Sequence, residues 1–101
     1  MAFDLRRALL AKEEIESARL MDFAFRQRAR ATRLLARRFG LDEDRLVREI
    51  ALIDEDSLLS EVAARAGAAP GEVAAAYRTC LSTARQELIG EIGDPTPHRL
   101  A

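Results

Sequence analysis

The chain is short, rich in charged residues and poor in aromatic ones. Its 101 residues are 33% charged, 49% hydrophobic and 5% aromatic, with no Trp and a formal net charge of −1. This size and composition indicate one small globular domain and exclude a disordered chain. The near-neutral net charge argues against a dedicated nucleic-acid binder. The sequence has no signal-peptide pattern and no run near the ~20 apolar residues of a membrane span, so we expect a cytoplasmic protein without membrane insertion.

The charge is unevenly divided along the chain. Residues 1–41 hold ten basic and five acidic residues, a net charge of +5. Residues 42–101 hold six basic and twelve acidic residues, a net charge of −6. Two halves of opposite charge neutralise each other when they pack together. The division therefore predicts that the second half of the chain covers basic residues of the first half.

Residues 4–39 contain neither Gly nor Pro and are dominated by Ala, Leu, Arg, Glu and Lys. Such a composition favours helix throughout, either as one long helix or as two with a joint. Asp4 can cap the start, and Gly40 offers a left-handed stop. The apolar stripe weakens where three Glu residues cluster near the start. We therefore expect residues 1–19 to form a mobile or separately oriented N-terminal segment, attached to a bundle of residues 20–93.

One face of this predicted helix is strongly basic. Four arginines, which we call the arginine ridge, recur at the i, i+4, i+7 and i+11 spacing of one helix face: Arg26, Arg30, Arg33 and Arg37. Like charges at this spacing repel by about 0.2–0.5 kcal/mol per pair, so an acidic surface should compensate them. Phe23 and Leu34 give the ridge an apolar margin. On roughly the opposite side we expect a core-facing stripe: Met21, Phe25, Thr32, Leu35, Ala36 and Phe39.

Two short helices are predicted next. Asp42 can cap the first, whose apolar face is expected to hold Leu46, Val47, Ile50 and Ile53. The acidic residues 54–56 favour the N-terminus of the second, because they complement the helix dipole. Gly67 should end this helix, whose apolar residues are Leu58, Leu59, Val62 and Ala66.

A longer helix is predicted after Pro70, which suits a first helical turn. Its apolar stripe is expected to hold Val73, Tyr77, Cys80, Leu81, Ala84, Leu88 and Ile92. Gly93 and the prolines that follow should end it, leaving residues 94–101 as a disordered tail. Because no strand pattern appears, the predicted fold is all-α, a four-helix bundle.

No group of residues in the sequence points to catalysis or to a bound metal. His98 is the only histidine and lies in the predicted tail, away from other candidate ligands. Cys80 is the only cysteine and falls in an apolar stripe, which indicates a buried, inert thiol. The scattered glycines form no phosphate-binding loop. We therefore predict a protein that is not an enzyme and needs no cofactor.

Residues 59–78 look like a helix-turn-helix, with Gly67 at the turn. Six positions would face a DNA groove: Pro70, Gly71, Glu72, Ala74, Ala75 and Ala76. They offer one carboxylate and several methyl groups, whereas DNA readers place Arg, Asn, Gln or Ser there. The surrounding half of the chain has a net charge of −6, which opposes attraction to phosphate. Because of these mismatches, a DNA-binding transcriptional regulator is kept only as the alternative function.

The arginine ridge supports a further hypothesis. Four guanidinium groups on one ridge could accept phosphates, for example those of an adenine nucleotide. No phosphate-binding loop and no aromatic platform accompanies them. Coverage of the ridge by the acidic half of the chain is therefore the leading interpretation.

Four segments of the chain follow the order of known family motifs. FRQRARATRLLA, at residues 25–36, is similar to F-R-x-x-A-R-x-x-K-L-L-G, and FDLRRALLAK, at residues 3–12, is similar to F-D-D-R-E-R-A-F-E-A-K. Residues 54–56 match D-E-D, and ARQEL, at residues 84–88, is similar to A-R-E-Q-I. Together they resemble the zeta subunit family, the small α-proteobacterial inhibitors of F-type ATP synthase. The resemblance spans most of the chain.

The resemblance implies an inhibitor whose N-terminal segment enters a catalytic interface of the ATP synthase head as a helix and blocks ATP hydrolysis. The partner would be the catalytic head of the enzyme, and the protein would lie at the inner membrane only through it. An amphipathic helix entering a groove needs apolar anchors and charged contacts. The implied partner-binding residues are Phe3, Asp4, Leu5, Arg6, Arg7, Leu9 and Lys12. The remaining alternative is an orphan helical bundle, whose N-terminal segment should pack firmly against the other helices.

Overall fold

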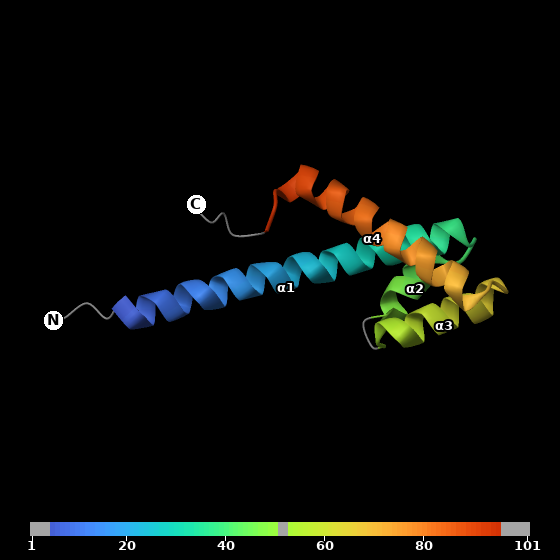
Figure 1. Ribbon diagram of the computed structural model, residues 1–101, viewed down its shortest axis with the longest axis horizontal. Helices are drawn as coiled ribbons and strands as arrows, with labels where there is room; N and C mark the ends of the chain where they lie inside the picture. Colours follow the sequence, from blue (N-terminus) through green and yellow to red (C-terminus); the bar gives the residue numbers. More distant parts are fainter. Residues whose placement is uncertain (1–4, 51–52, 96–101) are drawn as a thin grey trace.

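The structure, a computed structural model, describes residues 5–50 and 53–95, and the side chains of residues 11–49 and 53–95. The regular structure of this part is helical: α1 Leu5–Arg38, α2 Glu43–Ile50, α3 Glu55–Ala66 and α4 Pro70–Ile92. The four helices pack together (Figure 1), which confirms the predicted all-α, four-helix fold. Most of the predicted disordered tail lies outside the described residues.

Helix α1 is continuous over its 34 residues. Since no joint interrupts it, the alternative of one long helix is confirmed over that of two: the N-terminal segment is collinear with the rest of α1 and projects beyond the other helices (Figure 1). The longest dimension of the molecule is 65 Å and its radius of gyration is 17.7 Å. A compact domain of this length has a radius of gyration of about 13 Å. The projecting part of α1 accounts for the difference in shape.

One core lies where the helices meet. α4 packs along α1, α2 packs against α1, and α3 packs against α4. The core is built mainly from Leu, Val and Ala, as the low aromatic content predicts. Its largest fully buried side chains are Leu35, Leu46, Leu58, Val62, Val73 and Thr32.

The predicted core stripe of α1 is correct only in its C-terminal part. Thr32, Leu35 and Ala36 are fully buried and Phe39 packs against the core. Met21 and Phe25 are 73% and 64% exposed, so their assignment to the core is wrong. The reason is that α2 and α3 lie beside the C-terminal part of α1 only (Figure 1), so no element covers the stripe farther toward the N-terminus.

Phe23, on the apolar margin of the arginine ridge, is buried. Its side chain is only 4% exposed. α4 extends farther along α1 than α2 and α3 do, and Arg85 of α4 lies 5.8 Å from the centre of the Phe23 ring. This cation–π contact and the burial of Leu88 mark the last packed turns between α1 and α4.

The apolar stripe of α4 is confirmed except at its end. Five members of the predicted stripe are buried, and Leu81 packs against the core: the five are Val73, Tyr77, Cys80, Ala84 and Leu88. Ile92 is 55% exposed, so its assignment to the core is wrong. In Figure 1 the last turns of α4 diverge from α1, which leaves this position without a covering helix.

The predicted helix ends are confirmed by their hydrogen bonds. Asp42 accepts the backbone N–H of Arg45 at 3.1 Å, and Asp54 caps α3 by accepting that of Ser57 at 2.7 Å. Gly40 and Gly67 follow α1 and α3 with φ of 70° and 65°, the left-handed conformation that only Gly adopts readily. These short-range signals therefore fix the helix boundaries.

Replacing Gly67 tests the left-handed stop of α3. No atom lies within 4 Å of a Cβ added there, so the only cost of Gly67→Ala is backbone strain. We expect a loss of about 1–2 kcal/mol in the free energy of unfolding, measured by urea denaturation. Gly90→Ala is the matched control, because Gly90 lies inside α4 with equally open space. It should instead stabilise the protein by roughly 0.5–1 kcal/mol, and equal effects at both sites would contradict this account.

Candidate functional site

The sequence-predicted partner-binding residues lie in the first turns of α1 or before it. Phe3 and Asp4 lie outside the described residues. Four others belong to the described backbone of α1, while their side chains lie outside the described ones: Leu5, Arg6, Arg7 and Leu9. Lys12 is exposed on the projecting part of α1. The structure therefore places five of the seven residues on a helix that leaves the bundle, and the role of each side chain stays a prediction.

The projecting part of α1 is exposed as far as Phe23. From Ala11 to Asp22 every side chain is exposed except the half-buried Glu16. Ile15, with 61% of its surface exposed, and Met21 are large apolar side chains that no other described element covers. We call residues 5–22 the N-terminal arm. An exposed apolar surface of this kind is typical of an interaction site.

The arginine ridge meets carboxylates, most of them from the second half of the chain. Arg30 binds Glu91 of α4 with both terminal nitrogens at 2.8 Å and contacts Glu87 at 3.3 Å. Arg33 pairs with Asp44 at 2.7 Å and Arg37 with Glu43 at 2.9 Å, both of α2. Arg26 pairs within α1, with Asp22 at 2.9 Å. The predicted covering of the ridge by the acidic half is therefore confirmed for three of its four arginines.

These pairs shift the pKa values of the groups involved. The hydrogen bond from Arg30 lowers the pKa of Glu91, and the one from Arg33 lowers the pKa of Asp44. The hydrogen bond to Glu91 raises the pKa of Arg30. A phosphate binding at the ridge would have to displace these carboxylates. The hypothesis of a nucleotide or phosphate contact there stays a prediction that the observed pairing does not favour.

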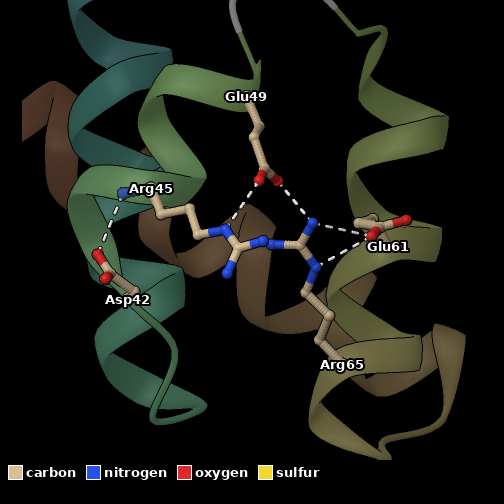
Figure 2. A network of polar contacts seen from close by, with 5 residues as sticks. All are labelled: Asp42, Arg45, Glu49, Glu61 and Arg65. Carbon is tan, nitrogen blue, oxygen red and sulfur yellow. Dashed lines mark hydrogen bonds and ion pairs between the residues drawn. The ribbon is translucent and has the colours of Figure 1, made fainter.

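A second set of ion pairs joins α2 to α3 (Figure 2). Glu49 of α2 accepts Arg45 at 3.2 Å and Arg65 of α3 at 2.6 Å. Arg65 also pairs with Glu61, one turn earlier in α3, at 2.9 Å. The hydrogen bond from Arg65 is the main cause of a lowered pKa of Glu49. This network orients α3 relative to α2. The two helices make few other contacts with each other.

Arg28 has a structural role that sequence reasoning missed. It lies off the ridge and donates a hydrogen bond of 2.7 Å from Nη2 to the carbonyl oxygen of Ile53, just before α3. Its Nε is buried and has no hydrogen-bond partner among the described residues. Thr32, one turn later, donates its hydroxyl to the Arg28 carbonyl at 2.8 Å. The only available signal was the spacing of Arg28 and Thr32 on one helix face, which does not identify the Ile53 carbonyl as a partner.

The helix-turn-helix alternative has its two consecutive helices, but the surface of α4 does not suit DNA binding. α3 and α4 are joined by a short turn at Gly67, and the residues at the start of α4 are exposed. Ala76, which the sequence assigned to the DNA-facing side, is only 4% exposed and belongs to the core. That assignment is wrong because α4 turns this face toward the other helices. Glu72 is the one charged side chain at the predicted groove-facing positions.

The described residues give little evidence for a membrane span, a metal site or a reactive thiol. No helix among them combines the length and hydrophobicity needed to cross a bilayer, and they contain no cluster of three or more candidate metal ligands. Cys80 is buried, and burial raises the pKa of its thiol. Comparisons with known proteins add no assignment: no protein-family model, curated protein or solved structure matches the chain. The functional argument therefore rests on the N-terminal arm and on the ion pairs that hold α1.

The lowered carboxylate pKa values predict acid sensitivity of the fold. Because the pKa values of Glu91, Asp44 and Glu49 are lower in the folded protein than their ordinary values of 4.5, 3.8 and 4.5, the unfolded chain takes up protons first on acidification. The free energy of unfolding should be constant above these ordinary values and fall as the pH drops through the lowered ones. Urea denaturation between about pH 7 and about pH 3 would measure this decline.

Glu91→Gln isolates the contribution of the Arg30 pair. We expect the variant to be less stable than the natural protein at neutral pH, and its stability to depend less on pH in the acidic range. Glu13→Gln is the matched control, since Glu13 is exposed within α1 and forms no ion pair among the described residues. Equal pH profiles for Glu91→Gln and the natural protein would refute the role of this pair.

Proposed function

We propose that the chain is a regulatory protein that inhibits ATP hydrolysis by the F-type ATP synthase, by inserting its N-terminal helix into the catalytic head. The observation that carries the proposal is the N-terminal arm, a helical continuation of α1 that projects from a packed bundle and exposes the large apolar side chains described on it, Ile15, Leu20 and Met21. The resemblance of four segments to the zeta subunit family supports the same function. The orphan-bundle alternative expects an arm packed against the other helices, which is not the arrangement in Figure 1.

The geometry suits insertion into a groove. The arm, residues 5–22, is about 27 Å long at 1.5 Å per residue. It is held at one end by the burial of Phe23 and by the core contacts of α1 beyond it. A helix that is already formed loses less conformational entropy on binding than a disordered segment does. The bundle at its base is much wider than a single helix, so it would limit the depth of insertion.

Deleting residues 2–14 tests the proposal. The variant should no longer inhibit ATP hydrolysis by purified ATP synthase head, because it lacks the tip of the arm and the predicted anchors Leu5 and Leu9. The bundle should stay folded, since the described side chains of the deleted stretch, those of residues 11–14, are exposed and lie outside the core. Circular dichroism and urea denaturation would check the fold. The measurement is the rate of ATP hydrolysis at increasing concentrations of each protein.

Ile92→Asp is a suitable control for this assay. Ile92 is exposed to a similar degree as Ile15, but it lies at the end of α4 and outside the arm. We expect Ile92→Asp to inhibit as strongly as the natural protein. If the natural protein leaves hydrolysis unchanged, the proposed function is wrong. If it then binds duplex DNA with a steep dependence on salt, the helix-turn-helix alternative takes its place.

A further inference from the structure

The short helix α2 has only a small apolar attachment to the bundle. Its eight residues make about two turns, and isolated helices shorter than roughly 12 residues are unstable in water. Among its described side chains only Leu46 is buried, whereas three side chains of α3 and six of α4 are. It packs mainly against α1 and makes little contact with α3 and α4. The helical form of α2 therefore depends on what holds it to α1.

The residues on either side of α2 are anchored independently of it. Leu41 packs against the core, and its backbone N–H donates to the carbonyl oxygen of Ala36 at 2.8 Å. Ile53 also packs against the core, and its carbonyl oxygen accepts the 2.7 Å hydrogen bond from Arg28. α2 thus lies between two fixed points, so it can leave α1 without moving α3 and α4. Fixed ends also keep the opened segment short, which makes reclosure easy.

The attachment of α2 to α1 is largely electrostatic. Asp44 pairs with Arg33 at 2.7 Å. Glu43 pairs with Arg37 at 2.9 Å. In each pair one side chain is exposed and the other is half-buried, so salt screens the attraction, and each pair contributes little by itself. The burial of Leu46 does not depend on charge, so salt should weaken the ion pairs selectively.

α4 holds the preceding part of the arginine ridge more firmly. Arg30 binds Glu91 with two nitrogens at 2.8 Å, and α4 itself is fixed by its six buried side chains. Separating this pair requires α4 to leave α1, which breaks the core. Arg33 and Arg37 form the part of the ridge that α2 covers. A displacement of the two turns of α2 uncovers only this part.

We propose that α2 is an electrostatically held cover that opens locally while α1, α3 and α4 stay packed, and that opens more readily as the salt concentration rises. In the open state Arg33 and Arg37 lose their carboxylates and become accessible to other anions. Arg65 of α3 loses Glu49 (Figure 2) but keeps Glu61 at 2.9 Å. The inference goes beyond the proposed inhibition and does not depend on it.

Backbone hydrogen exchange of the full chain measures this opening. The amides of Val47, Arg48 and Glu49 report on α2, because each donates within that helix. Those of Tyr77 and Cys80 report on the core of α4. After correction for intrinsic rates, we expect the α2 amides to exchange about tenfold or more faster than the α4 amides. Their exchange should depend little on dilute urea, since a local opening exposes little surface.

Salt is the second variable of the experiment. Raising NaCl from about 0.02 M to about 0.5 M shortens the screening length several-fold, so exchange in α2 should accelerate about threefold or more. The amides of α4 should respond less, because the core that protects them is apolar.

Variants of α1 test the cause without altering the sequence of α2. Arg33→Gln combined with Arg37→Gln removes both ion pairs and should accelerate exchange in α2 about threefold to tenfold, the effect of two exposed pairs. It should also reduce the dependence on salt. Arg26→Gln is the matched control, because Arg26 lies on the same ridge but pairs with Asp22 inside α1. It should leave exchange in α2 unchanged. Circular dichroism would verify that both variants are folded.

Three results would overturn the inference. The first is exchange of the α2 amides at the rate of the α4 amides and with the same urea dependence, because α2 then opens only when the whole protein unfolds. The second is exchange in α2 that salt does not accelerate. The third is a double variant whose exchange in α2 matches that of Arg26→Gln. None of these measurements involves ATP hydrolysis, so the proposed inhibition and the opening of α2 can fail separately.

Discussion

The pairing of the arginine ridge with acidic residues of α2 and α4 is the constraint on which the rest of the structure depends. A ridge of like charges on α1 would be unfavourable on an isolated helix. Individual exposed ion pairs add little stability, but they are directional, whereas apolar burial is not. Glu91 meets Arg30 and Asp44 meets Arg33 only in one register of the two helices along α1. The core holds the helices together, and these pairs select the arrangement in which they meet.

How much the sequence predicts depends on whether a feature is local. The caps at Asp42 and Asp54 and the left-handed stops at Gly40 and Gly67 involve neighbouring residues only, and all four are confirmed. The covering of the ridge follows from the division of charge between the two halves. Which carboxylate meets which guanidinium depends on the crossing of distant helices, and the sequence does not specify it.

The three residues wrongly assigned to the core share one cause. Met21 and Phe25 belong to a stripe with correct helical spacing, and Ile92 belongs to another, yet all three are exposed. Periodicity indicates which face of a helix is apolar, but not how far along it a partner extends. Phe23 shows the converse, because α4 reaches past α2 and α3 and buries a residue on a different face. Burial at the ends of a bundle therefore depends on the relative lengths of the helices. At those ends the surplus apolar surface becomes available for binding.

The continuity of α1 links the two parts of the molecule mechanically. The arm has no joint of its own, so its direction is set by the packing of residues 23–38 against the other helices. A partner that grips the arm therefore also determines where the bundle lies. Conversely, the pairs of Arg30 with Glu87 and Glu91 sit close to the point where α1 leaves the bundle, one to two turns after Phe23. In the proposed inhibitor these pairs oppose bending at the base of the arm, because a force applied to its tip produces the largest bending moment there. In this proposal the ridge supports the helix that binds, and the binding surface lies on the turns that precede it.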